Sequence, residues 1–252
     1  MNVLLKPHSE ETQQRIAREK VVLAVQDTTS LHFSLHPASE NLGLNWSEEE
    51  EFIDLLVHST MTFNPEGTPL GLLDAQCWEP DAAFGKRHKG KRSPSEEKQS
   101  AKWLTSFRRV AEVQRRSPGT RLVSVGVRES DIYELFHEAL QDPQGPWLLI
   151  RAVQDRRLAE DQQQLVSWVK QQPAAGIQQI QVPRHGTQAK RVARLELRFA
   201  QVRLQPPKRN KSLGELALWA VLAQEVEAPP GIAPLRWMLL TTCPLESFEA
   251  AC

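Results

Sequence analysis

Apolar residues alternate with polar ones, or recur at helical spacing, along most of the chain, and each pattern predicts an element. The helical pattern predicts helices at 9–20, 95–116 and 131–141, and a polar helix or long loop at 160–171. The alternating pattern predicts strands at 21–25, 55–63, 69–78, 121–127, 146–153, 193–204, 216–226 and 234–242, with further alternation at 30–35. The turn sequence Asn64-Pro65-Glu66-Gly67 joins two of these strands in a hairpin.

The order of these elements indicates a fold class. Three antiparallel strands are followed by a helix, a strand, a helix, a strand and a largely β extension. We therefore expect an α/β fold, a ribonuclease H-like mixed sheet flanked by helices, with a mainly β insertion towards the C-terminus. The expected parts are a helical segment at 1–20, a core at 21–157 and the insertion region at 158–252. In such a sheet the first strand lies beside strand 121–127, so Asp27, expected at a strand end, faces the same cleft as the end of that strand.

A charged box, Arg128-Glu129-Ser130-Asp131, stands between strand 121–127 and the helix that follows it. Two interpretations stay open for this box. Its acidic groups suit the dipole at the N-terminus of the helix and can simply cap it. Alternatively, the charged side chains surround a metal site.

Length and composition limit the classes of protein to which this chain can belong. With 252 residues, 40% of them hydrophobic, the chain can bury the core of one large domain, or of one domain with an insertion. No apolar run reaches the roughly 18 residues that span a bilayer, and the N-terminus lacks the apolar core of a signal peptide, so we expect a soluble cytoplasmic protein. Cys77, Cys243 and Cys252 are odd in number and widely spaced, which indicates neither a disulfide scaffold nor a zinc site.

Charge changes this picture, because a net charge of zero hides strong segregation along the chain. Basic residues dominate two runs, 86–116 and 184–211, while acidic residues concentrate elsewhere, notably at Glu48 to Glu51. Each basic run is either a solvated face or part of a phosphate-binding surface.

Five separated segments, in the same order, closely resemble bacterial DDE transposases of the insertion-sequence-four family. They are QDTTSLHF, GTPLGLLDAQCW, PSEEKQSAKW, RESDIYELF and PLRWMLLTT, and the resemblance covers nearly the whole chain. It implies cut-and-paste DNA transposition, in which three carboxylates hold two divalent ions, usually magnesium, for in-line displacement at phosphorus. It also implies double-stranded DNA at transposon ends as the partner, a homodimer in the intact family, no membrane partner, and a place at the bacterial nucleoid.

The resemblance assigns the metal ligands one by one. Asp27, followed by Thr28, matches the first family carboxylate and metal ligand; taken alone it would be a strand-end cap. The second family aspartate stands in a Gly-Asp-Arg-Glu pattern, but this chain has Val127 at that position, and Asp131 is a poor substitute for it. The third carboxylate, a glutamate in a Tyr-Arg-Glu-Lys pattern, is expected beyond Cys252. We therefore expect a central fragment that keeps one ligand of three and lacks the family's N-terminal end-reading module.

The roles in DNA binding carry over more fully. Trp237 matches an aromatic residue on which the family stacks a flipped base, or else is a core aromatic of the sheet. Arg151 matches an arginine that grips DNA near that base, or else is an ordinary surface arginine. Glu129 and Asp131 would support the cleft, with Arg128 contacting phosphate or carboxylate. Further phosphate contacts are expected from Lys86, Arg87, Lys89, Lys91 and Arg92.

Three hypotheses of function follow. The leading one is a DDE transposase that keeps its scaffold and weak DNA affinity but is catalytically incompetent. The second is a non-catalytic DNA-binding or regulatory remnant that competes with intact transposase. The third is an unrelated metal-dependent nuclease of the same fold, which uses Asp27, Asp74 and Asp131.

Overall fold

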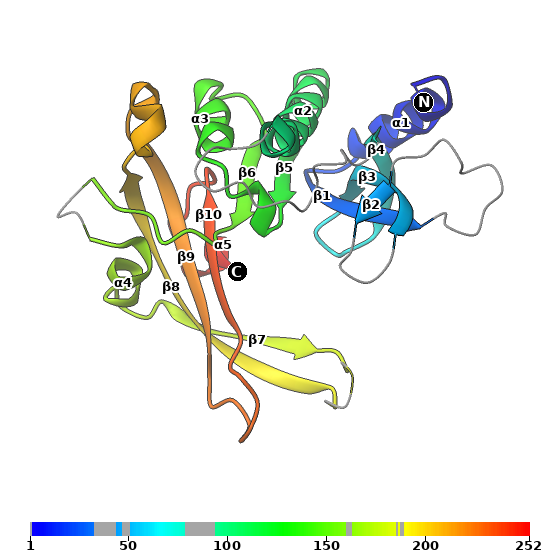
Figure 1. Ribbon diagram of the computed structural model, residues 1–252. Coiled ribbons are helices and arrows are strands. Elements are labelled where there is room, and N and C mark those ends of the chain that lie inside the picture. The colour runs from blue at the N-terminus through cyan, green and yellow to red at the C-terminus, as the bar shows by residue number, and fades with distance from the viewer. Residues whose placement is uncertain are drawn as a thin grey trace. The chain divides into compact units, whose positions relative to one another are not determined.

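The chain divides into two compact units (Figure 1). The main boundary along the sequence lies between Gly126 and Val127. Unit 1 comprises residues 1–126 and 144–146, and unit 2 comprises residues 127–143 and 147–252. The computed structural model describes residues 2–32, 44–46, 51–78, 94–159, 163–184, 186 and 189–252.

The described residues form strands, helices and two short 3₁₀ helices. The strands are β1 (Val21–His32), β2 (Leu44–Trp46), β3 (Glu51–Phe63), β4 (Pro69–Trp78), β5 (Arg121–Gly126), β6 (Trp147–Arg151), β7 (Gly176–Val182), β8 (Arg191–Leu204), β9 (Leu216–Val226) and β10 (Arg236–Thr241). The helices are α1 (Asn2–Ile16), α2 (Pro94–Arg116), α3 (Tyr133–Gln141), α4 (Leu165–Lys170) and α5 (Phe248–Ala251), and the 3₁₀ helices are η2 (Arg128–Ser130) and η3 (Lys208–Leu213).

Strand β1 is the centre of unit 1. It pairs antiparallel with β3 and parallel with β5, while β3 also pairs antiparallel with β4 and with β2. Val22 and Ala24 of β1 are fully buried against α2, which contributes Val110 and Val113 to the same cluster. The pattern of alternate buried residues thus fixes which face of β1 meets the helix.

The turn from α2 into β5 is held by one buried side chain, Gln114. Its amide nitrogen donates to the carbonyl of Thr120 (2.7 Å) and its oxygen accepts from the backbone N–H of Leu122 (2.8 Å). The hydroxyl of Thr120 in turn donates to the carbonyl of Ile16, the last residue of α1, and to that of Glu19 in the turn that follows. These bonds satisfy backbone groups that the end of a helix leaves without partners.

Unit 2 is an antiparallel sheet with the strand order β6-β10-β9-β8-β7. Helix α3 packs on β6 and β9, and α4 packs on β8 and β9. Figure 1 shows β8 and β9 as the longest strands of this unit, with β7 continuing along the far end of β8. The buried residues alternate along β6, where Leu148 and Ile150 are each 1% exposed.

The predicted fold class, an α/β ribonuclease H-like mixed sheet flanked by helices, is wrong. Strands make up 41% of the described residues, so this part of the chain is mostly β. The helices of unit 2 are short, with nine residues in α3, six in α4 and four in α5. Pairing extends some strands beyond the predicted apolar cores, as in β3 with 13 residues and β8 with 14, whereas β6 with five residues and β10 with six are shorter than predicted.

Individual elements were predicted better than their boundaries. The hairpin of β3 and β4 is confirmed, and so is the neighbouring parallel pair of β1 and β5, in which Gln26 lies opposite Gly126. The position of Asp27 at a strand end is wrong, because β1 continues to His32 and pairs Asp27 with Ser59 inside the ladder. Strand β7 was not predicted.

Within the described ranges, no helix combines the length and the apolar character that crossing a bilayer requires.

His58 is a buried titratable group on the helix-covered face of unit 1. Its Nδ1 lies 2.9 Å from the hydroxyl oxygen of Thr28, and its ring meets the ring of Trp103 edge-on, with 4.4 Å between the centroids. Burial, and secondarily the Lys102 ammonium, lower the pKa of His58 from 6.5 to about 4.

This shift predicts a loss of stability in acid. Between pH 6.5 and about 4 the unfolded chain takes up a proton at His58 while the folded chain does not, so the free energy of unfolding falls as the pH falls. The variant His58→Asn lacks this titration, so its unfolding free energy should fall less over that range. Urea unfolding at a series of pH values measures the difference. His8→Asn, at an exposed position of α1, is the control; equal pH slopes for His58→Asn and the unaltered chain would contradict the prediction.

Candidate functional site

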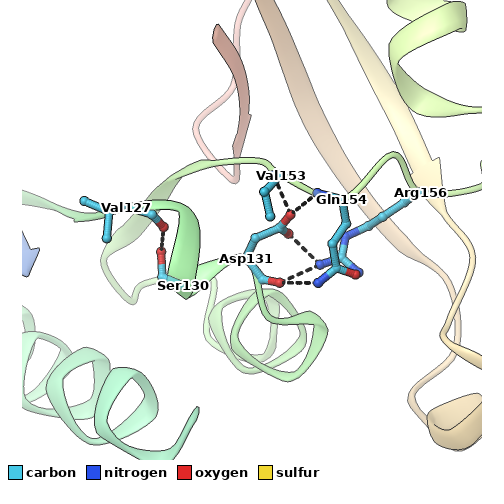
Figure 2. A network of polar contacts seen from close by, with 6 residues as sticks. All are labelled: Val127, Ser130, Asp131, Val153, Gln154 and Arg156. Atoms are coloured by element: carbon cyan, nitrogen blue, oxygen red, sulfur yellow. Dashed lines mark hydrogen bonds and ion pairs between the residues drawn. The ribbon is translucent and has the colours of Figure 1, made fainter. Parts of the chain in front are cut away.

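Asp131 is the centre of a buried polar network in unit 2 (Figure 2). One of its carboxylate oxygens accepts backbone N–H groups of Val153 and Gln154, each at 2.8 Å, and the other accepts the guanidinium of Arg156. The backbone carbonyl of Asp131 also accepts from the side chains of Gln154 (2.9 Å) and Arg156 (2.8 Å). The side chain of Asp131 is only 1% exposed, so these hydrogen bonds replace water at every accessible position.

The turn before Asp131 is short and tightly bonded. Val127 is extended, and its carbonyl accepts both the backbone N–H (3.0 Å) and the hydroxyl (2.6 Å) of Ser130, which closes the 3₁₀ helix η2. Helix α3 then begins at Tyr133 rather than at Asp131. The charged box is therefore a turn that ends in a buried carboxylate, with Arg128 and Glu129 exposed on its outer side.

The guanidinium of Arg156 is held on its other side by aromatic rings. It lies 5.9 Å from the ring centroid of Tyr133 and 6.0 Å from that of Phe136, both on α3. The hydroxyl of Tyr133 donates to the carbonyls of Leu204 (3.2 Å) and Gly214 (2.6 Å), and burial raises the pKa of Tyr133 to about 12. The loop after β6 is thus anchored to α3, and α3 to the segments that flank η3.

Beside this network lies a hollow of about 260 Å³ that we call the arginine pocket. It is lined by Arg128, Arg151, Ala152, Val153, Gln154, Val166, Arg236 and Met238, all of unit 2. Burial, and secondarily the positive charge of Arg128, lower the pKa of Arg151. The Asp131 network fixes the loop 152–154 that forms one wall of the pocket.

The three arginines of the pocket differ from the arginines of β8. Those of β8 are matched by glutamates: Arg191 pairs with Glu225, Arg194 with Glu227, Arg198 with Glu196 and Arg203 with Glu215. For Arg128, Arg151 and Arg236, in contrast, no carboxylate in the part of the chain that the structure describes forms an ion pair. Guanidinium groups without an acidic partner around one hollow are suited to a phosphate or another anion, which they bind in bidentate fashion.

Trp237 does not line the arginine pocket. It stands between Arg236 and Met238 on β10, and side chains alternate along a strand, so its ring starts from the opposite face. There it is half-buried and packs against the cluster of Leu195, Leu197 and Ala223. Its contacts are those of a sheet aromatic, and the predicted stacking on a base stays a prediction.

Asp27 has an exposed carboxylate in the middle of β1, and this carboxylate accepts the backbone N–H of Thr28 at 2.8 Å. Asp74 belongs to the other face of the same sheet, because it pairs with Thr60 and Thr60 pairs with Gln26, one residue from Asp27. Among the described residues, no group of three His, Cys, Asp or Glu side chains is placed to hold a metal ion.

The remaining predicted residues divide into two sets. Val127, the position at which the resemblance asks for a carboxylate, is 37% exposed directly after β5. The predicted phosphate contacts Lys86, Arg87, Lys89, Lys91 and Arg92 lie outside the described residues.

Sequence reasoning missed Arg236 and Arg156. Arg236 is part of the segment PLRWMLLTT and stands next to Trp237, and alternation along that strand could have separated the faces of the two residues. Arg156 has no local signal, because its partner Asp131 lies 25 residues away.

No family model matches the sequence.

The Asp131 network makes a prediction about stability. Asp131→Ala leaves the buried guanidinium of Arg156 and two backbone N–H groups without an acceptor, so it should lower the free energy of unfolding by about 3–5 kcal/mol. Glu129→Ala, at an exposed position two residues earlier, should lower it by less than about 1 kcal/mol. Urea unfolding measures both changes, and similar small effects of the two substitutions would contradict the assigned role.

Proposed function

We propose that this protein binds double-stranded DNA through the arginine pocket and derives from the DDE transposases that its sequence resembles, without catalysing strand cleavage. The observation that carries the proposal is the pocket itself, in which three arginines line one hollow of about 260 Å³. Two of them, Arg128 and Arg151, are among the residues that the resemblance independently associates with DNA.

The electrostatics of the pocket favour a phosphate ligand. Three permanent positive charges lie around one hollow, and burial raises the cost of charging Arg151. An anion that enters the pocket relieves the mutual repulsion of the guanidinium groups and accepts their hydrogen bonds. The phosphodiester backbone of DNA supplies such anions at regular spacing, whatever its sequence.

The proposed absence of cleavage is supported by the positions and hydrogen bonds of the carboxylates that could bind metal. Valine at 127 offers no oxygen ligand, the oxygens of Asp131 are already bonded to protein groups, and Asp74 is on the opposite face of the sheet from Asp27. These residues do not fit a site for two magnesium ions, which need several well-placed oxygen ligands. Binding without cleavage makes the chain a competitor of intact transposase for DNA at the bacterial nucleoid, in the cytoplasm.

DNA binding should depend steeply on salt and on the arginines of the pocket. Each substitution, Arg128→Ala, Arg151→Ala or Arg236→Ala, removes about one phosphate contact, so it should weaken binding about tenfold at low salt and reduce the slope of log K against log salt by about one. Fluorescence anisotropy of a labelled duplex over a range of salt concentrations measures both quantities.

The matched control is Arg194→Ala. Arg194 is an exposed arginine of unit 2 that is already paired with Glu227, so its removal should leave the affinity and the salt slope nearly unchanged. If none of the three pocket variants binds more weakly than this control, the proposed interface is refuted. If the unaltered chain does not bind duplex DNA at low ionic strength, the proposed function is refuted as a whole.

The purified chain should leave duplex DNA intact in the presence of Mg²⁺. A supercoiled plasmid and a transposon-end duplex, each incubated with chain and metal and resolved on a denaturing gel, report single nicks. Nicking that requires Mg²⁺ and disappears in Asp27→Ala would overturn this part of the proposal, because it would show that Asp27 takes part in a working metal site.

A further inference from the structure

Unit 1 contains a hollow of its own, which we call the α1–β4 cavity. Its volume is about 490 Å³, within the roughly 300–1,000 Å³ that is usual for small-molecule sites. Helices α1 and α2 and strand β4 line it, and all three belong to unit 1. Five of the lining side chains are charged: Lys6, Glu10, Asp74, Arg109 and Arg116. The cavity is therefore large enough for a small molecule and offers it both signs of charge.

A β-bulge in β4 directs Asp74 to the cavity. Leu72 pairs with Met61 of β3 and Asp74 pairs with Thr60, so Leu73 is an extra residue in the ladder. Strict alternation would send the side chains of Leu73 and Asp74 to opposite faces, and a bulge changes the direction of a side chain at this point. Leu73 and Asp74 accordingly both line the cavity, and Leu73 also belongs to the buried core of unit 1.

Three of the five charges already have a partner on their own helix. Lys6 lies 3.9 Å from Glu10 on α1, where both side chains are largely exposed. Arg109 lies 2.6 Å from Glu112 on α2. These two pairs neutralise each other's charge at the surface, which leaves one carboxylate and one guanidinium to meet a ligand.

That carboxylate and that guanidinium are those of Asp74 and Arg116, neither of which forms an ion pair within the described ranges. The guanidinium of Arg116 donates a long hydrogen bond, of 3.5 Å, to the side-chain oxygen of Gln13. Burial raises the pKa of Asp74, and the charge of Arg109 and the backbone N–H of Ala75 offset only part of that rise. The carboxylate of Asp74 is thus partly removed from water without a counter-charge beside it.

We propose that the α1–β4 cavity binds a free amino acid, whose ammonium group pairs with Asp74 and whose carboxylate pairs with Arg116. This inference is independent of DNA binding. Asp74 and Arg116 line one cavity but do not pair with each other, so a ligand that carries both charges can bridge them. The ammonium supplies the missing counter-charge, and the planar guanidinium matches a carboxylate in bidentate fashion.

The other lining residues narrow the class of ligand. A ligand with positive charge alone would leave Arg116 unpaired, and one with negative charge alone would leave Asp74 unpaired. The cavity wall also includes Leu5, which is half-buried, and Leu73. Apolar surface beside two opposite charges favours an amino acid with an aliphatic side chain, such as leucine.

Isothermal titration calorimetry of the full chain with L-leucine tests the proposal. Leucine should bind, while isoamylamine, which lacks the carboxylate, and isocaproate, which lacks the ammonium, should each bind more weakly. Asp74→Asn and Arg116→Gln keep the shape of the side chain approximately but remove its charge, so each should weaken leucine binding about tenfold or more. The matched controls Glu66→Gln and Arg115→Gln alter exposed residues that do not line the cavity, and both should bind leucine normally.

The stability of Asp74→Asn without ligand distinguishes a binding residue from a structural one. The variant removes a partly buried charge that has no counter-charge, so its midpoint of urea unfolding should be equal to or higher than that of the unaltered chain. A lower midpoint would show a structural role and overturn the proposal. Circular dichroism shows whether each variant is folded.

Three further results would overturn the proposal: leucine that does not bind, a folded Asp74→Asn variant that binds leucine normally, or an analogue with one charge that binds as tightly as leucine. Arg128→Ala, which tests the arginine pocket, should bind leucine like the unaltered chain. Failure of DNA binding and failure of amino-acid binding are therefore separate results.

Discussion

The carboxylate of Asp131 is the interaction on which the arrangement of unit 2 around the arginine pocket depends. It accepts two consecutive backbone N–H groups from the loop after β6 and the guanidinium of Arg156. Leaving a buried guanidinium without its counter-charge, or two buried N–H groups without an acceptor, costs free energy, so these bonds favour the observed position of the loop. The last residue of the charged box thus anchors the loop 152–154 to the turn after β5.

The two sets of arginines in unit 2 show that the basic run 184–211 does not mark the arginines that gather around the pocket. Along β8, arginines lie within reach of glutamates on the same or neighbouring strands, and the run is largely neutralised. At the pocket, Arg128, Arg151 and Arg236 come from segments more than 20 residues apart in sequence, so no local count of charge reveals their proximity. The proposed anion site is therefore the group of arginines with the weaker signal in the sequence.

Local patterns in the sequence predicted well which elements form, but they predicted poorly the residues at which each element begins and ends. The alternation in 55–63 and 69–78 led to the correct hairpin, since a turn and two flanking strands carry all the information that a hairpin needs. Strand β7 was missed because its isoleucines and valine are interrupted by glutamines in a glutamine-rich region, which blurs the contrast between faces. The fold class failed for a related reason: the lengths of paired strands, and thus the balance of strand and helix, are set by partners far away in the sequence.

The residues of the candidate site also divide into those that the sequence predicted and those that it did not. Arg128 and Arg151 could be named because the resemblance assigns roles to short motifs, whereas Arg236, Arg156 and the loop 152–154 join the site only through tertiary contacts. Val127 and Arg128 are adjacent in one turn, yet the proposed function gives them different chemistry: a carboxylate at the first position would serve metal binding, and the guanidinium at the second would serve phosphate binding. Because the arginine pocket draws no ligand from Asp27 or from position 127, a substitution that removes the metal site leaves the pocket intact. Under the proposed function, loss of cleavage therefore does not require loss of DNA binding, and Val127 is one position at which the two would separate.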